Sequence, residues 1–336
     1  MTTAVQAQGL VKLFDDVRAV DGVDLDIGEG EIFGVLGPNG AGKTTMLKML
    51  ATLLKIDEGT ASIFGVDVRR EPHRVRQLIG VTGQYASVDE NLTATENLWM
   101  FGRLQGLGSR QSRTTAAELL EQFGLADAAD KRISQFSGGM RRRLDLAASL
   151  ITRPPLIFLD EPTTGLDPRT RGQMWETIRG LVASGCTVLL TTQYLDEADQ
   201  LAGRIAVIDR GRKVAEGTPD ELKTSVGNLT LTLRLAPGAD AGLAADVVRR
   251  LLGEEPVLTA ESGQLNVPLQ TADRVADVLI GLRQADVSVA SIGVDKPTLD
   301  EVFLALTGHD ATDGAPADVD VPAPSHDTKT PQEASR

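Results

Sequence analysis

Residues 37–45 read Gly37-Pro38-Asn39-Gly40-Ala41-Gly42-Lys43-Thr44-Thr45. The apolar run Ile32 to Leu36 precedes this stretch, and a helical pattern from Thr44 to Leu54 follows it. A glycine-rich loop between a strand and a helix, ending in lysine and threonine, is typical of a phosphate loop. Its backbone amides and the helix N-terminus attract phosphate oxygens, Lys43 adds a full positive charge, and the Thr44 hydroxyl suits Mg²⁺. The sequence therefore predicts that residues 37–45 bind a nucleotide.

A second motif lies further along the chain, where the apolar run Leu156-Ile157-Phe158-Leu159 ends in Asp160-Glu161. In open α/β sheets, ligands bind beyond the carboxyl ends of the strands. We therefore expect Asp160 to hold the Mg²⁺ shell and Glu161 to polarise an attacking water. The alternative for Glu161 is a helix-capping or surface carboxylate.

Strand-like and helical patterns alternate through residues 5–225, which predicts a mostly parallel sheet with helices on its faces. The predicted pairs are Glu31–Leu36 with Thr44–Leu54, Leu156–Leu159 with Thr170–Ala183, and Thr187–Thr191 with Leu195–Leu201. The segment of about 91–150 is mostly helical and is expected to form a helical subdomain inserted into this α/β core.

The pattern changes at about residue 228. Residues 228–308 follow the order β-α-β-β-α-β, which predicts a small α+β domain with a ferredoxin-like split βαβ arrangement. A last helix, Leu299 to Leu306, is expected to close this accessory domain. Residues 309–336 are rich in Asp, Pro, Ala and Thr and poor in large apolar side chains, so a disordered acidic tail is expected there.

Composition excludes several classes of function. The chain has 336 residues, a net charge of −13 and 4% aromatic residues, which disfavours non-specific binding to nucleic acid. The single cysteine, Cys186, lies in an apolar strand-like run, so we expect neither a disulfide framework nor a metal cluster, and a cytoplasmic compartment. The sequence has no apolar stretch of about 18 residues, so any membrane pore would belong to another chain.

The order of the motifs resembles the ATP-binding cassette of ABC transporters. The shared features are the phosphate loop, Gln84, the Ser137-Gly138-Gly139 turn, Asp160-Glu161 and Gly165-Leu166-Asp167. The resemblance covers about residues 5–225 and implies a P-loop NTPase that hydrolyses ATP with Mg²⁺. It also implies a head-to-tail homodimer with two ATP molecules at the interface, bound to a separate transmembrane permease on the cytoplasmic face of the membrane.

The resemblance assigns roles to individual residues. Ser137, Gly138 and Gly139 of one subunit would contact the γ-phosphate bound by the other, and Asp167 would link the two sites. Gln84 would sense the metal and the γ-phosphate. Phe14 fits the position where an aromatic ring stacks on adenine, with a core phenylalanine as the alternative.

Two departures from the family pattern stand out. Phe136 and Met140 flank the glycine turn where leucine and glutamine are more common, and the run Arg141-Arg142-Arg143 then begins a helix, either facing the partner's phosphates or forming a solvated face. Gln193 stands where the family usually has histidine. An amide donates a hydrogen bond but carries no charge and shuttles no proton, so we expect hydrolysis to continue with Glu161 or the substrate itself taking the proton.

The wider pattern resembles the daunorubicin/doxorubicin-resistance type of ATP-binding subunit. The residues that carry this resemblance are the segments 81–85, 136–143, 191–199 and Leu299-Asp300-Glu301-Val302-Phe303-Leu304. It implies export of antibiotics or other amphiphiles. The alternatives are an exporter of lipid, sodium or polysaccharide and a soluble ABC ATPase acting on ribosomes or DNA. The last segment would also fit an ordinary amphipathic helix.

Overall fold

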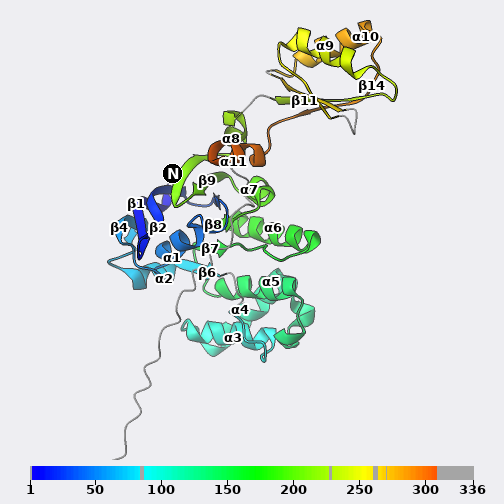
Figure 1. The fold of residues 1–336 in the computed structure, drawn as a ribbon. Coiled ribbons are helices and arrows are strands. Elements are labelled where there is room, and N and C mark those ends of the chain that lie inside the picture. The colour runs from blue at the N-terminus through cyan, green and yellow to red at the C-terminus, as the bar shows by residue number, and fades with distance from the viewer. Residues whose placement is uncertain (1, 84–86, 227–228, 260–263, 270, 309–336) are drawn as a thin grey trace, which may run out of the picture.

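A computed structural model describes residues 2–83, 87–226, 229–259, 264–269 and 271–308. Figure 1 shows a layered body that contains most of the helices and strands, and a smaller sheet with two helices that follows it in the chain. The predicted acidic tail, 309–336, lies outside the described residues.

The centre of the larger body is a six-stranded sheet with the order β10-β9-β3-β8-β7-β6. Its strands are β3 (Ile32–Leu36), β6 (Ile79–Thr82), β7 (Leu156–Asp160), β8 (Thr187–Thr192), β9 (Arg204–Asp209) and β10 (Arg212–Gly217). All neighbours from β6 to β9 are parallel, and only β10 pairs antiparallel, with β9. Every residue of β3, β7 and β8 is buried, as expected of parallel strands covered on both faces. The predicted mostly parallel sheet is confirmed.

An antiparallel sheet that the sequence analysis did not predict lies beside the first. Its order is β2-β1-β4-β5, with bounds β1 (Thr3–Phe14), β2 (Val17–Gly28), β4 (Glu58–Ile63) and β5 (Val66–Asp67). Both sheets contribute buried residues to one core together with helix α1 (Lys43–Leu50). The body also contains helices α2 (Pro72–Leu78), α6 (Pro168–Ala183), α7 (Leu195–Leu201) and α8 (Pro219–Val226).

A group of helices lies within the predicted range of 91–150. It comprises α3 (Ala94–Leu104), α4 (Ser109–Gln122), the 3-10 turns η1 (Ala126–Ala128) and η2 (Ile133–Gln135), and α5 (Gly138–Ser149). Thr93 and Glu96 cap the start of α3 reciprocally, each side chain accepting from the other's backbone amide. The buried residues of this group share a core with β7 and β8, so the helices are anchored to the central sheet.

The predicted β-α-β-β-α-β order of the accessory domain is confirmed. Its elements are β11 (Leu229–Leu235), α9 (Ala241–Leu252), β12 (Val257–Thr259), β13 (Gln264–Leu269), α10 (Arg274–Gln284) and β14 (Val289–Asp295). The strands form an antiparallel sheet with the order β12-β13-β11-β14. The domain has its own core beneath α9 and α10.

Helix α11 (Leu299–Thr307) does not close this accessory domain, so that part of the prediction is wrong. Its buried side chains Leu299, Val302 and Phe303 pack with residues of β3, α7, β9 and α8 in the larger body. Figure 1 shows α11 beside α8, away from the accessory sheet. The amphipathic stripe was correctly recognised, but a stripe does not specify the surface that it covers.

Candidate functional site

Two positions of the phosphate loop have no room for a side chain. Gly42 has a φ of 102°, and a Cβ there would lie 2.2 Å from the Ala19 carbonyl oxygen. A Cβ on Gly37 would lie 2.2 Å from the carbonyl oxygen of Ile208. Gly42 is also the N-cap of α1 and gives it no side-chain cap, so the first amides of α1 are available to an anion.

Lys43 connects the phosphate loop to Glu161. Its Nζ donates to the carbonyl oxygens of Gly37 at 2.8 Å and Pro38 at 2.9 Å, and lies 3.5 Å from Glu161 Oε1. The side chain is only 4% exposed. Burial lowers the pKa of Lys43, and the neighbouring Glu161 carboxylate opposes that shift. The buried Lys43 ammonium group of the loop therefore lies beside the buried Glu161 carboxylate that follows β7.

Asp160 joins two threonines at the carboxyl edge of the sheet. Its Oδ1 accepts hydrogen bonds from Thr44 Oγ1 at 2.9 Å and from Thr191 Oγ1 at 2.6 Å. A hydroxyl beside a carboxylate is the oxygen donor set that Mg²⁺ takes in phosphate sites, where phosphates and water complete the shell. Across the described ranges there is no group of three or more His, Cys, Asp or Glu side chains that could hold a metal ion by itself.

Glu161 is fixed by its backbone as well as by its side chain. Its φ is 49°, a left-handed conformation that is costly for a residue other than glycine. Its amide donates to the Thr191 carbonyl and hydroxyl oxygens, each at 3.1 Å, and its Oε2 accepts from Thr164 Oγ1 at 3.2 Å. This buried carboxylate does not match the alternative of a surface group.

The serine-glycine turn lies at the start of α5. Ser137 is exposed and caps the helix by accepting from the Met140 amide at 3.3 Å. A Cβ on Gly139 would lie 2.2 Å from Thr170 Cγ2, so only glycine lets α5 approach α6 this closely. No hydrogen bond or ion pair within the described part of the chain joins Ser137, Gly138 or Gly139 to residues 37–45 of the same chain.

Asp167 caps the start of α6. Its carboxylate accepts from the Thr170 amide at 3.0 Å and from Thr170 Oγ1 at 2.6 Å. These bonds, the hydroxyl's first, hold the pKa of this exposed carboxyl below its usual range. Thr170 also packs against Gly139, so it connects Asp167 to the start of α5.

The remaining predicted site residues are placed less fully. Gln193 is half-buried and directly follows β8, next to Tyr194, whose ring lies 5.0 Å from Arg171 Cζ. Phe14 is half-buried at the end of β1, with Lys12 Nζ 5.3 Å from its ring centroid, so it is not a fully buried core residue. Gln84 lies outside the described residues.

The sequence did not predict the observed roles of two residues beside Asp160 and Glu161. Thr191 holds both Asp160 and the Glu161 amide, and a polar residue at the end of an apolar strand was the available signal. Arg142 is only 9% exposed, so for this residue the alternative of a solvated face is wrong. By contrast, Arg141 is partly exposed and forms an ion pair with Glu90 at 2.6 Å.

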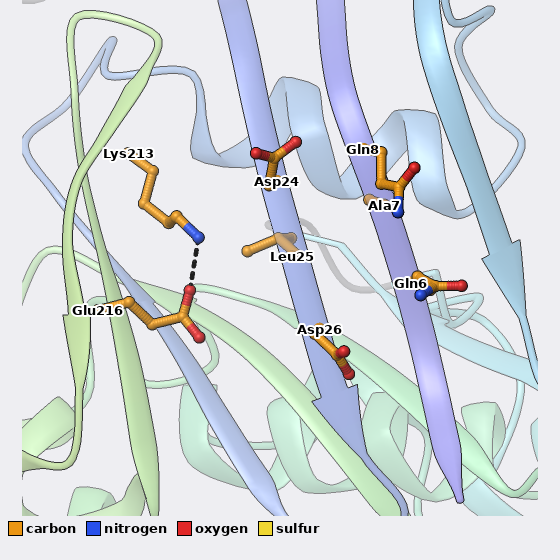
Figure 2. Close-up of a pocket in the computed structure, with 8 residues that line it drawn as sticks. All are labelled: Gln6, Ala7, Gln8, Asp24, Leu25, Asp26, Lys213 and Glu216. Atoms are coloured by element: carbon orange, nitrogen blue, oxygen red, sulfur yellow. Dashed lines mark hydrogen bonds and ion pairs between the residues drawn. The ribbon is translucent and has the colours of Figure 1, made fainter.

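An open hollow of about 470 Å³ lies elsewhere, against β1, β2 and β10 (Figure 2). Its lining includes Asp24, Asp26 and Lys213, which forms an ion pair with Glu216 at 2.6 Å. None of the residues that line it belongs to segments 37–45, 137–139 or 160–167. The hollow is therefore separate from the residues that the sequence predicts to bind the nucleotide.

Family models match two parts of the chain. The ABC transporter model matches residues 20–164, and the model for the C-terminal domain of DrrA1-3-like ATP-binding proteins matches residues 217–307. The second range includes α11, although this helix packs on the larger body. None of the described helices is long and apolar enough to cross a membrane.

Curated relatives extend over nearly the whole chain. The daunorubicin/doxorubicin resistance ATP-binding protein DrrA of Streptomyces peucetius is 55% identical over 319 residues, covering 93% of this chain and 94% of that protein. The daunorubicin resistance ATP-binding protein DrrA2 of Streptomyces coeruleorubidus is 53% identical, covering 91% and 95%. A Nod factor export ATP-binding protein I of Ralstonia nicotianae is 39% identical, covering 93% and 96%.

Solved structures are similar to the larger body. An ATP-binding cassette of an ABC transporter in its ADP conformation is 26% identical with a TM-score of 0.61, covering 66% of this chain and 93% of that one. A dimeric cassette in a post-hydrolysis state, bound to ADP and Pi, is 28% identical with a TM-score of 0.58, covering 64% and 98%.

Proposed function

The chain belongs to the ABC transporter ATP-binding proteins of the daunorubicin/doxorubicin-resistance type, and on this premise we propose that it energises export of an amphiphilic drug-like compound through a separate transmembrane chain. The observation that carries the proposal is the convergence of Lys43, Thr44, Asp160 and Glu161 at one edge of the central sheet. The strand ends of β3 and β7 bring together the phosphate loop and the carboxylates that hydrolysis needs.

Nucleotide binding would exchange one set of contacts for another. Lys43 donates to carbonyl oxygens of its own loop, and these are weaker acceptors than the oxygens of a phosphate. The β- and γ-phosphates would take over its ammonium group, while the amides at the start of α1 surround them. Thr44 and Asp160 would hold Mg²⁺, which offsets the negative charge of the phosphates. Phe14 would stack on the adenine.

Glu161 would act as the general base. When Lys43 turns to the phosphates, the Glu161 carboxylate loses its cation neighbour and becomes free to accept a proton from water. Its left-handed backbone and the hydrogen bond from Thr164 keep it aimed at the loop. Gln193 would donate an amide hydrogen bond to a γ-phosphate oxygen without carrying charge.

Two copies would complete each site. Ser137 and Gly138 are exposed and Gly139 is buried at the start of α5, and no hydrogen bond or ion pair among the described residues joins them to the phosphate loop of their own chain. We infer that this turn closes on the ATP held by a second copy, with Asp167 beside it. The dimeric cassette bound to ADP and Pi, 28% identical to this chain, supports a dimer.

The relatives support the proposed export partner and substrate. Their names concern resistance to daunorubicin and doxorubicin, which are amphiphilic, and this supports an amphiphile as the substrate. We infer that the chain works at the cytoplasmic face of the cell membrane. The Nod factor export relative, 39% identical, supports a second candidate, export of another class of compound. Action on ribosomes or DNA has no support among these relatives.

The test expresses the chain together with a candidate transmembrane partner in a drug-sensitive bacterium. Lys43→Ala should abolish tolerance to daunorubicin, because the phosphates lose their buried cation. Lys48→Ala is the matched control, since Lys48 is an exposed lysine on the same helix, and it should leave tolerance unchanged. Equal sensitivity of the parent and Lys43→Ala strains to every amphiphile tested would count against drug export.

A further inference from the structure

Arg142 is a buried cation on helix α5 that none of the roles above uses. It is 9% exposed, although its neighbours in the sequence point elsewhere. Arg141 pairs with Glu90, and Arg143 donates to the Phe123 carbonyl oxygen at 3.1 Å. Burying a guanidinium is costly unless its N–H donors find hydrogen-bond acceptors, so the acceptors of Arg142 indicate its role.

The Arg142 guanidinium donates to backbone carbonyls from two strand ends. After β7 it reaches the carbonyl oxygens of Asp160 at 3.0 Å, Glu161 at 3.0 Å and Pro162 at 3.1 Å. After β6 it reaches the carbonyl oxygen of Gly83 at 2.6 Å. Arginine presents five N–H donors in a fixed planar fork, which suits several acceptors at fixed positions.

These contacts hold the turn that carries Glu161. Its φ of 49° is a strained conformation that persists only when the surroundings impose it. The Glu161 amide donates to Thr191, and the Glu161 carbonyl oxygen accepts from Arg142. The orientation of the Glu161 carboxylate therefore depends on a residue of helix α5, which precedes β7 in the chain.

The same face of α5 holds a second segment. Asp145, three residues beyond Arg142 and on the same side of the helix, accepts from the Ser87 amide at 2.7 Å. Arg142 holds Gly83, so the described residues on both sides of segment 84–86 are bonded to α5. Ser137 begins this helix, and Gly139 packs on Thr170.

We propose that Arg142 is a positioning residue that fixes the Asp160–Pro162 turn to helix α5, so that Glu161 and the Ser137 turn move as one unit. This inference rests on the proposed function, in which Glu161 serves the ATP of its own chain and Ser137 serves the ATP of the partner. Each ATP of the proposed dimer would contact both chains. Arg142 thereby couples the ATP bound by its own chain to the ATP bound by the partner.

The first experiment measures turnover and nucleotide affinity of the full-length chain. Arg142→Gln should lower kcat for MgATP by about a hundredfold, because displacing a reacting group by about 1 Å costs that much. Affinity for trinitrophenyl-ATP should stay within about threefold of the parent, since the phosphate loop is intact. A kcat equal to the parent's, or a parallel loss of kcat and affinity, would overturn the positioning role.

Two further variants separate positioning from folding. Arg142→Lys keeps the cation but offers three donors from one point, so it should fold and should restore kcat only in part. Arg143→Gln is the matched control, because it removes a bond to Phe123 on the same helix and should leave kcat within about twofold. If Arg142→Gln does not fold, Arg142→Lys decides: a kcat equal to the parent's overturns the proposal.

The coupling itself is tested by a double-mutant cycle with Ser137→Ala. If Arg142 joins the two sites, the double variant should lose less kcat than the product of the single losses, by about fivefold or more. Independent, multiplicative losses would overturn the coupling. A parent chain with no MgATP-dependent phosphate release would refute the proposed function, and with it this inference, whereas failure of the cycle alone leaves the function intact.

Discussion

At the residue scale, the phosphate loop allows a sharp prediction at Gly42. A methyl group at Gly42 would lie 2.2 Å from the Ala19 carbonyl oxygen, in a backbone conformation that alanine rarely adopts. Gly42→Ala should therefore displace the start of α1 and lower the affinity for trinitrophenyl-ATP by about a hundredfold or more.

The control is Gly180→Ala, at an exposed position of α6 with nothing within 4 Å of the added carbon. It should bind nucleotide as the parent does and gain up to about 1 kcal/mol of stability, because alanine is the better helix former. Equal affinity in the parent and the Gly42→Ala variant would show that the loop can move away from Ala19.

Gln193 provides a prediction about catalysis. It directly follows the buried strand β8, whose Thr191 holds both Asp160 and the Glu161 amide. Gln193→His would place a group that can carry charge at this position, so kcat for MgATP should stay equal or rise by up to about tenfold. The measurement is steady-state phosphate release. A collapse of turnover would contradict the view that glutamine is a weaker substitute for histidine.

Cys186 gives a prediction about reactivity and pH. Burial raises the pKa of this thiol from 9.0 to about 11. At about pH 8 only ~0.1% is thiolate, so iodoacetamide should label the native chain very slowly and the chain in guanidinium rapidly. Since Cys186 is the only cysteine in the sequence, mass spectrometry reads the result directly. Rapid labelling of the native chain would contradict the burial.

The raised pKa of Cys186 also predicts how the stability of the fold changes with pH. Because the folded-state pKa is above the unfolded value of 9.0, the native state binds this proton more tightly. The protonated thiol therefore contributes to the free energy of unfolding. This contribution is fully present below pH 9 and is lost as the pH rises through the folded-state pKa of about 11.

At the scale of elements, the docking of α11 on the larger body is the contact to test. Phe303 is 1% exposed and packs in the cluster that includes Leu195 and Leu222, from α7 and α8. Phe303→Ala should lower the free energy of unfolding by about 3–5 kcal/mol, through lost burial and the cavity that remains. Urea denaturation followed by tryptophan fluorescence measures it.

Leu304 is the matched control on the same helix, because it is 47% exposed. Leu304→Ala should change the free energy of unfolding by no more than about 0.5 kcal/mol. Similar losses in the two variants would mean that α11 does not dock through the Phe303 face.

The elements show what the sequence can and cannot predict. Strands β3, β7 and β8 were recognisable because parallel strands buried on both faces are continuous apolar runs. Strands β1 and β2 were missed because register shifts interrupt their alternation, as between Ala7 and Leu10 around Gly9, whose φ is 57°. A pattern of period two is lost at such a shift.

The candidate site follows the same rule. Residues such as Lys43, Thr44 and Asp160 were predictable because the site uses local motifs at strand ends. Arg142 was not, because its role depends on carbonyl groups from two distant segments, and a run of arginines looks the same whether it is buried or exposed.

At the scale of the whole molecule, the residues of the candidate site come from two parts of the larger body. The central sheet carries Lys43, Asp160 and Glu161, while the helical group carries Ser137 at the start of α5. The accessory domain is attached at both ends to the larger body, through α8 before β11 and through α11 after β14. Figure 1 shows α8 and α11 side by side. The chain therefore enters the accessory domain and returns from it at neighbouring positions on the larger body. Helix α11 packs on α7, which begins two residues after Gln193.

The separation of Ser137 from the phosphate loop of its own chain predicts association that depends on ATP. Glu161→Gln keeps the shape of the side chain but removes the base, so ATP should remain bound and hold two copies together. In sedimentation velocity, the Glu161→Gln chain should be mainly dimeric with millimolar MgATP and mainly monomeric with ADP. Adding Ser137→Arg should abolish the ATP-dependent dimer while nucleotide affinity stays within about threefold, because the bulky cation would stand on the surface proposed to meet the partner and away from the phosphate loop of its own chain. Dimerisation of the double variant, or a Glu161→Gln monomer saturated with ATP, would show that the Ser137 turn does not close on a second copy.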